Sequence, residues 1–164
     1  MGISMSLYLC DDAQIREFSD DVNRVEDFII RSPNRGDCYL ADFWDGIHYL
    51  LTSGTDTRDL PLAALKTGDV EFRGGASATH AIFSETAKAF AEELQSLSEQ
   101  TLRERFDPGR MLEARVDPIR PWLFPEHAES TFRDLMFYFD RLRNIASAAS
   151  REGQGLLFTR YEDW

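Results

Sequence analysis

His48 is the residue whose type and position suggest chemistry most directly. Asp45 precedes it by three residues, so in a helix the two side chains lie about one turn apart. A histidine oriented by a carboxylate can act as a general base. The alternative is a hydrogen-bonded histidine at the edge of an apolar helix face, packed against Trp44. The hydroxyls nearest in sequence, Thr52 and Ser53, belong to the expected helix end, so no nucleophile is evident.

The remaining histidines and the cysteines do not form a recognisable metal motif. His48, His80 and His127, with Cys10 and Cys38, lack the paired spacing of two to four residues found in structural zinc sites. Two cysteines are too few for a disulfide framework, and two buried thiols are favoured over one bridge. The sequence also contains no phosphate-binding loop, dinucleotide fingerprint, zinc helix or nucleophile elbow. We therefore expect no metal site and no cofactor.

The charge balance points to a different kind of site. The 164 residues include 18 basic and 29 acidic side chains, for a formal net charge of −11. This argues against nucleic acid, whose binding depends on Lys and Arg contacts to phosphates, and against anionic membrane surfaces. Such a negative net charge favours a basic protein as the partner. The acids are densest in residues 11–27, where seven carboxylates accompany only Arg16 and Arg24.

The same segment predicts the element that would present these acids. Its apolar residues recur at spacings of three and four, which indicates one amphipathic helix that ends near Pro33. These apolar residues are Ile15, Phe18, Val22, Val25 and Ile29. Glu17, Asp20 and Asp27 fall on the opposite side of the expected helix. They form either a docking surface for a cationic partner or a solvated helix face.

The rest of the chain predicts short strands and amphipathic helices. Strands are expected at Met5–Cys10, 70–72, 78–83 and 156–161, with the last paired to the first. Helices are expected at 41–52, at 60–66, from Ser84, from Ser98, from Asp107 and over 125–150, and an extended connection carries Trp122. This pattern is typical of an α+β fold. We expect a single helix-rich domain over residues 1–164, with a small sheet that includes the N- and C-terminal strands.

Several stretches, distributed over nearly the whole chain, resemble one protein family. They are Met1–Tyr8, Phe43–Gly54, Leu60–Leu65 with Gly68, Ile82–Glu85 and Gly153–Leu157. Together they are similar to the YfbM-like proteins, small bacterial proteins classed as a domain of unknown function (DUF1877). Ser4-Met5-Ser6 and the segment from Gly74 to Thr79 depart from the pattern. The resemblance implies a compact α+β domain with a Trp44/His48 signature, but no established activity and no catalytic residues.

Two functions therefore stay open. The first is a non-catalytic protein-binding module of the bacterial cytoplasm, for example an immunity or neutralising partner of a basic protein. The alternative is an enzyme of unrecognised type or a small-ligand binder, with a pocket around Trp44, His48 and Trp122. A perturbed His48 in a concave site favours the alternative, whereas a solvated His48 favours the first. The cytoplasm is expected because no apolar run reaches the roughly 20 residues of a membrane span and no signal peptide is evident.

Overall fold

A central antiparallel sheet holds the two ends of the chain together. The computed structural model describes residues 2–32, 36–73 and 78–162. Its five strands follow the order β2-β1-β5-β4-β3, with bounds Ile3–Cys10 (β1), Cys38–Ala41 (β2), Val70–Phe72 (β3), Ala78–Ile82 (β4) and Gly155–Glu162 (β5). β1 and β5 pair along their whole length, from Ile3 opposite Glu162 to Cys10 opposite Gly155. The predicted pairing of the first and last strands is therefore confirmed.

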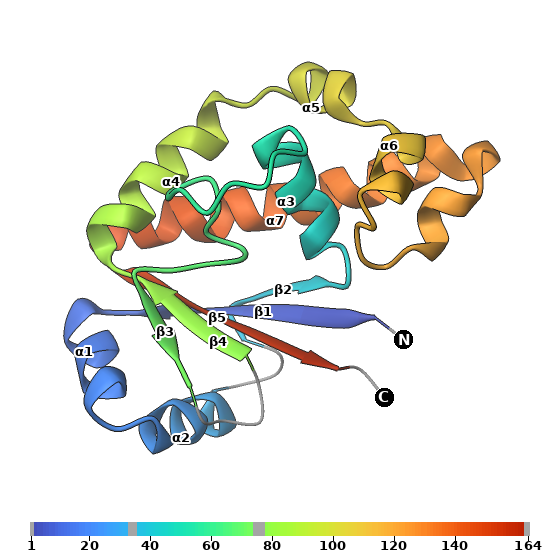
Figure 1. Cartoon of the computed structure of the whole chain (residues 1–164). Coiled ribbons are helices and arrows are strands. Elements are labelled where there is room, and N and C mark those ends of the chain that lie inside the picture. The colour runs from blue at the N-terminus through green and yellow to red at the C-terminus, as the bar shows by residue number, and fades with distance from the viewer. Residues whose placement is uncertain (1, 33–35, 74–77, 163–164) are drawn as a thin grey trace.

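The sheet separates two hydrophobic cores of unequal size. Alternate residues of a strand point to opposite faces, so Leu7 and Phe158 face the larger core, whereas Tyr8 and Leu157 face the smaller one. Helices α3 to α7 lie on the first face of the sheet, and α1 and α2 lie on the second (Figure 1). This arrangement is the helix-rich α+β domain that the sequence predicts.

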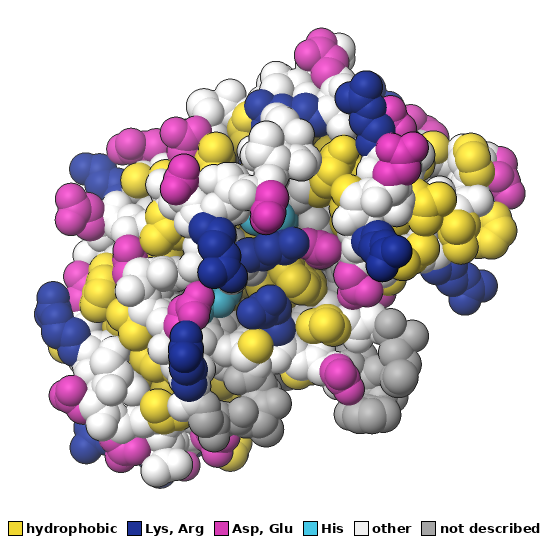
Figure 2. Space-filling view, viewed as in Figure 1, with side chains coloured by type: hydrophobic (Ala, Val, Ile, Leu, Met, Phe, Trp, Pro, Cys, Tyr) yellow, Lys and Arg dark blue, Asp and Glu magenta, His cyan; other side chains and the backbone are white. Residues whose placement is uncertain are grey.

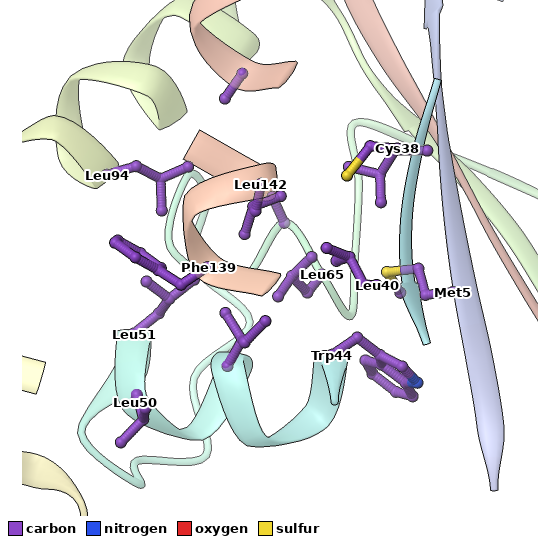
Figure 3. Packing of buried hydrophobic residues seen from close by; sticks show 14 of the residues in the cluster. Met5, Cys38, Leu40, Trp44, Leu50, Leu51, Leu65, Leu94, Phe139 and Leu142 are labelled. Atoms are coloured by element: carbon purple, nitrogen blue, oxygen red, sulfur yellow. The ribbon is translucent and has the colours of Figure 1, made fainter. Parts of the chain in front are cut away.

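The larger core is built around the longest helix. The helices span Asp12–Asp20 (α1), Asn23–Arg31 (α2), Trp44–Thr52 (α3), Ser84–Ser96 (α4), Glu99–Arg105 (α5), Pro108–Glu113 (α6) and Ala128–Glu152 (α7), with 3-10 turns at Arg120–Leu123 (η1) and Pro125–His127 (η2). Phe139 and Leu142 of α7 are buried, and Figure 3 shows them among side chains from α3, α4 and β2. The apolar residues whose spacing predicted a long helix over 125–150 thus form the face of α7 that contacts the core.

The predicted single helix after β1 is wrong, because the helix breaks at Asp21. The backbone of Asp21 is extended (φ −147°, ψ 101°), and its carboxylate accepts a hydrogen bond from the amide of Asn23 at 3.1 Å. An Asp side chain that bonds to a backbone amide two residues further on competes with the helix. As a result Glu17 and Asp20 lie on α1, whereas Asp27 lies on α2.

Two predictions on either side of α3 are also corrected. Residues 38–41 form strand β2 against β1, so α3 begins at Trp44 and not at Ala41. Residues 60–66 form consecutive turns instead of a helix. Their amides bond to carbonyls both three and four residues back, which prevents a regular α-helical ladder. These turns bring Lys66 to Asp45 in the first turn of α3.

Two details of the predicted connections differ as well. Trp122 lies in the 3-10 turn η1 and not in an extended segment. Ser84, expected as an N-cap, is instead the first residue of α4. Asp12 of α1 accepts hydrogen bonds from the amide and the hydroxyl of Ser84 at 2.8 and 2.7 Å. A carboxylate from another helix therefore caps α4 and ties it to α1.

Candidate functional site

α3 holds Asp45 and His48 between the sheet and a returning loop. At its start the indole of Trp44 donates a hydrogen bond to the carbonyl of Ile3 at 2.6 Å, which fixes the helix to β1. At its end Ser53 and Gly54 adopt left-handed conformations, with φ of 54° and 73°. Such a helix end reverses the chain direction. The loop that follows, residues 55–69, leads to β3 and passes the last turn of α3.

Gly46 lets α3 pack closely on its other neighbours. A Cβ atom at this position would lie 2.8 Å from Cδ2 of Leu135 and 3.3 Å from Cη2 of Trp122. Trp122 is buried, and its indole donates a hydrogen bond to the carbonyl of Val116 at 2.8 Å. Trp122 therefore acts as a packing residue that supports α3.

His48 lines a hollow of about 290 Å³ between the end of α3, the loop after it and residues 114–116. It is 6% exposed, and in the described part of the chain its Nδ1 has no hydrogen-bond partner. Burial, together with the positive charge of Lys66, lowers the pKa of His48 to about 4, whereas Asp45 and Asp56 act in the opposite direction. The imidazole is therefore neutral near pH 7 and can accept a hydrogen bond from a ligand.

The carboxylate of Asp45 serves the fold and does not orient His48. Its Oδ1 lies 2.9 Å from Nζ of Lys66, and its Oδ2 accepts a hydrogen bond from the amide of Asp117 at 2.9 Å. Lys66 comes from the turns at 60–66, and Asp117 comes from the segment before η1. Asp45 therefore joins two loops across the first turn of α3, in place of the predicted pairing with His48.

A second hollow adjoins the first, because Asp56 and Lys66 line both. It has a volume of about 380 Å³ and lies between the loop after α3 and strands β3, β4 and β5. The cations that line it are Arg58, Lys66, Arg73 and Arg160, against two carboxylates, Asp56 and Glu71. We call these two hollows together the basic cleft. Figure 2 shows dark blue side chains gathered in the middle of this face, beside cyan histidine atoms.

His80 lines the second hollow of the basic cleft. Its ring stacks on Phe158 at a centroid distance of 4.8 Å, and its Nε2 lies 2.6 Å from the carbonyl oxygen of Ala64. Because a carbonyl only accepts, Nε2 is the nitrogen that donates. Burial lowers the pKa of His80 to about 4, opposed by the bond to Ala64 and aided by Arg160. The neutral ring leaves Nδ1 as a hydrogen-bond acceptor.

Arg160 contributes a cation from a central strand. It follows Phe158 by two residues on β5, so both side chains lie on the face of the larger core. Its guanidinium carbon lies 5.5 Å from the centre of the Trp44 ring, and its Nε is buried without a hydrogen-bond partner among the described residues. Within those residues no ion pair joins Arg58, Arg73 or Arg160 to a carboxylate. Among the described residues, these three guanidinium groups of the cleft are therefore outside any ion pair.

The predicted pocket around Trp44, His48 and Trp122 is only partly assembled. His48 lines the basic cleft, whereas the two tryptophans belong to the larger core. The cations of the cleft were not predicted as site residues, because they come from segments that only the tertiary fold brings together. Arg160 could have been found from the sequence. It follows Phe158 by two residues in the expected last strand, so its side chain is expected on the same, inward face.

The three acids predicted to bind a partner lie in another layer. Glu17, Asp20 and Asp27 are exposed on α1 and α2, on the face of the sheet opposite to α3 (Figure 1). Arg24 of α2 lies 3.5 Å from the carboxylate of Glu17. One of the three acids is therefore paired within the layer, and the three do not share one helix.

The described residues contain neither a metal-binding group nor a helix that could cross a membrane. In residues 2–32, 36–73 and 78–162, no three His, Cys, Asp or Glu side chains are grouped so that they could hold a metal ion. None of the helices described there combines the length and apolar character that a bilayer crossing requires. Cys10 and Cys38 are both buried free thiols, as predicted, and burial raises the pKa of each, to about 12 and about 11.

The comparisons with known proteins agree on the family and the fold. No curated protein matches the chain. A solved structure, "The Crystal Structure of a Protein of Unknown Function YfbM from Escherichia coli", matches with a TM-score of 0.76 and 18% sequence identity, over 97% of this chain and 99% of that chain. At this identity the likeness shows a shared fold. The family model "Domain of unknown function (DUF1877)" matches residues 1–159. The protein therefore belongs to the DUF1877 family, the family that its sequence stretches resemble.

Proposed function

We propose that the protein binds a small ligand carrying a phosphate or carboxylate group in the basic cleft. The observation that supports this proposal is the local excess of cations on a chain whose formal net charge is −11. Arg160 adds a buried Nε that has no partner among the described residues. A buried donor without a partner costs about 1–3 kcal/mol, so the site pays to keep this guanidinium at the cleft.

The two kinds of side chain in the cleft suit two parts of such a ligand. Guanidinium groups bind phosphate and carboxylate oxygens through paired N–H donors, so Arg58, Arg73 and Arg160 suit the anionic group. The neutral imidazoles of His48 and His80 suit hydroxyl or amide donors elsewhere on the ligand. Lys66 lines both hollows, so it lies where the two parts would meet.

Binding fits the geometry better than catalysis does. A histidine with a pKa of about 4 is a weak general base at neutral pH. The hydroxyl of Thr52 donates to the carbonyl of His48 at 2.9 Å and is thus committed to its own helix. Among the described residues no hydroxyl bonds to Nδ1 of His48. The role proposed for His48 is therefore to accept a hydrogen bond from the ligand.

The two lysines of the chain provide a matched test. Lys66 lines the basic cleft, and Lys88 is exposed on α4. We expect isothermal titration calorimetry at low ionic strength to detect binding of at least one probe among pyrophosphate, adenosine monophosphate and citrate. The substitution Lys66→Ala should weaken that binding by about tenfold, which equals about 1.4 kcal/mol, and Lys88→Ala should leave it unchanged. Absence of binding for every probe, or equal weakening by both substitutions, would refute the proposal.

A basic partner protein is a second candidate, in keeping with the net charge of −11. In this hypothesis the exposed acids Glu17, Asp20 and Asp27 attract the partner, and their combined change to Lys slows association by about tenfold while the fold stays intact. The test is association kinetics with a captured partner at two salt concentrations, and equal rates would reject these acids as a contact. For either function we propose a bacterial cytoplasmic setting, on the basis of the family resemblance and the bias of basic residues toward arginine.

A further inference from the structure

A third and larger hollow lies on the other side of Asp117 from the basic cleft. It is an open groove of about 810 Å³ between the first half of α7, the turns η1 and η2, and the connection from β2 to α3. Its lining here includes His127 at the end of η2 and Thr131 and Asp134 on α7, which follow one another at spacings of four and three. From His127 to Asp134 this part of the lining is about 10 Å long, at 1.5 Å per residue.

Apolar side chains are exposed along this groove. Ile119 and Phe124, which line it, are 43% and 42% exposed, and the neighbouring Leu123 is 51% exposed. Phe43 lines the groove and stacks on Tyr138 at a centroid distance of 5.3 Å. Exposed apolar side chains that gather beside a hollow mark binding surfaces on soluble proteins. The aromatic rings are also favourable neighbours for cationic groups.

The charge of the groove is opposite to that of the basic cleft. Asp42, Asp117 and Asp134 line it, against Arg120 and the exposed His127. With the chain's net charge of −11, this lining favours a cationic occupant and disfavours a second copy of the same acidic chain. We call this surface the acidic groove.

We propose that the acidic groove binds a segment of another protein that carries Arg or Lys next to apolar side chains. The apolar side chains would contact Ile119, Phe124 and Phe43, and the cations would meet the three aspartates. An extended segment of about three residues matches the 10 Å length, at roughly 3.3 Å per residue. This site is separate from the basic cleft and stands whether or not that cleft binds an anion.

Selection from an unbiased peptide library tests the proposal. A phage-displayed library of random twelve-residue peptides is selected against the full chain, and the recovered peptides are synthesised and measured by fluorescence polarisation. We expect the recovered peptides to combine Arg or Lys with aliphatic or aromatic residues. Their affinity should fall about tenfold or more in Asp134→Lys, because a repulsive charge then replaces an attractive one.

A matched substitution separates specific binding from general attraction to an acidic protein. Glu92 is exposed on α4, and Glu92→Lys changes the net charge by the same amount as Asp134→Lys. We expect Glu92→Lys to weaken the peptides by less than about twofold, as screening limits a distant exposed charge. Circular dichroism confirms that both variants are folded. Recovery of no peptide above background, recovery of peptides without basic residues, or equal weakening by the two variants would overturn the proposal.

Discussion

The basic cleft and the acidic groove carry opposite charge although one carboxylate connects them. Asp45 pairs through Oδ1 with Lys66, which lines the cleft, and accepts through Oδ2 from the amide of Asp117, which lines the groove. The cleft holds buried imidazoles and an excess of guanidinium groups over carboxylates, whereas the groove holds exposed apolar side chains and aspartates. The difference shows that a net charge of −11 describes the chain but not its individual surfaces. An acidic protein can therefore present separate sites for an anion and for a cationic segment.

The largest effect is expected from Trp44→Ala, which removes a buried wall beside the basic cleft. Trp44 is 4% exposed, bonds to Ile3 and lies under Arg160, so its truncation should lower the free energy of unfolding by about 3–5 kcal/mol. Urea unfolding measures the change. Phe139→Ala, at a core position on α7, should have a similar effect on stability. A loss below about 1 kcal/mol for Trp44→Ala would contradict its place in the core.

The two buried histidines should make stability depend on pH. The pKa of each is lowered to about 4, below the usual value of 6.5, so between these values the unfolded chain binds more protons than the folded one. Their contribution is present above about pH 6.5 and is lost as the pH falls toward 4. Between pH 7 and pH 5 we expect each histidine to account for a loss of roughly 1–2 kcal/mol.

Histidine variants isolate this contribution from that of the carboxylates. In urea unfolding at pH 7 and pH 5, His48→Asn should reduce the loss seen in the unchanged protein. His127→Asn, at an exposed position on η2, serves as the control and should not alter the loss. An unchanged pH dependence in His48→Asn would show that the imidazole is solvated and not buried in the cleft.

A smaller effect is expected where the two surfaces join. Asp45→Asn removes the charge that Lys66 contacts but keeps a polar side chain of the same shape. Since Lys66 is 45% exposed, the stability loss should be only about 1 kcal/mol. The anion affinity of the cleft should rise, because Lys66 is no longer neutralised. Asp140→Asn, whose partner Arg143 lies on the same helix, is the control and should change neither property. Weaker anion binding in Asp45→Asn would show that the ion pair is needed to position Lys66.

The sequence predicted those parts of the fold that local patterns determine. Apolar spacing located α4 and α7, and the short apolar runs at both ends located β1 and β5. The four-residue strand β2 was missed because so short a segment has no clear period, and its pairing with β1 is a tertiary contact. The break between α1 and α2 was missed because one side-chain bond from Asp21 outweighs a continuous apolar pattern.

The candidate site was less predictable than the fold. His48 stood out by residue type, and the structure places it in a concave site with a perturbed pKa. The functional partner assumed for it, Asp45, instead bonds to two loops distant in sequence. Arg58, Arg73 and Lys66 gather only after the loop following α3 folds over the sheet, and no spacing rule connects such residues.

Chemical-shift mapping tests most directly whether the two surfaces select opposite charges. The ¹⁵N-labelled full chain is titrated with pyrophosphate at low ionic strength, and the backbone amide signals are followed by NMR. We expect shifts that saturate and that centre on Arg58, Lys66, His80 and Arg160, with no change at Ile119 and Asp134 of the acidic groove. Shifts centred on the groove, shifts spread evenly over the surface, or no shifts up to millimolar pyrophosphate would contradict the assignment of the basic cleft as an anion site.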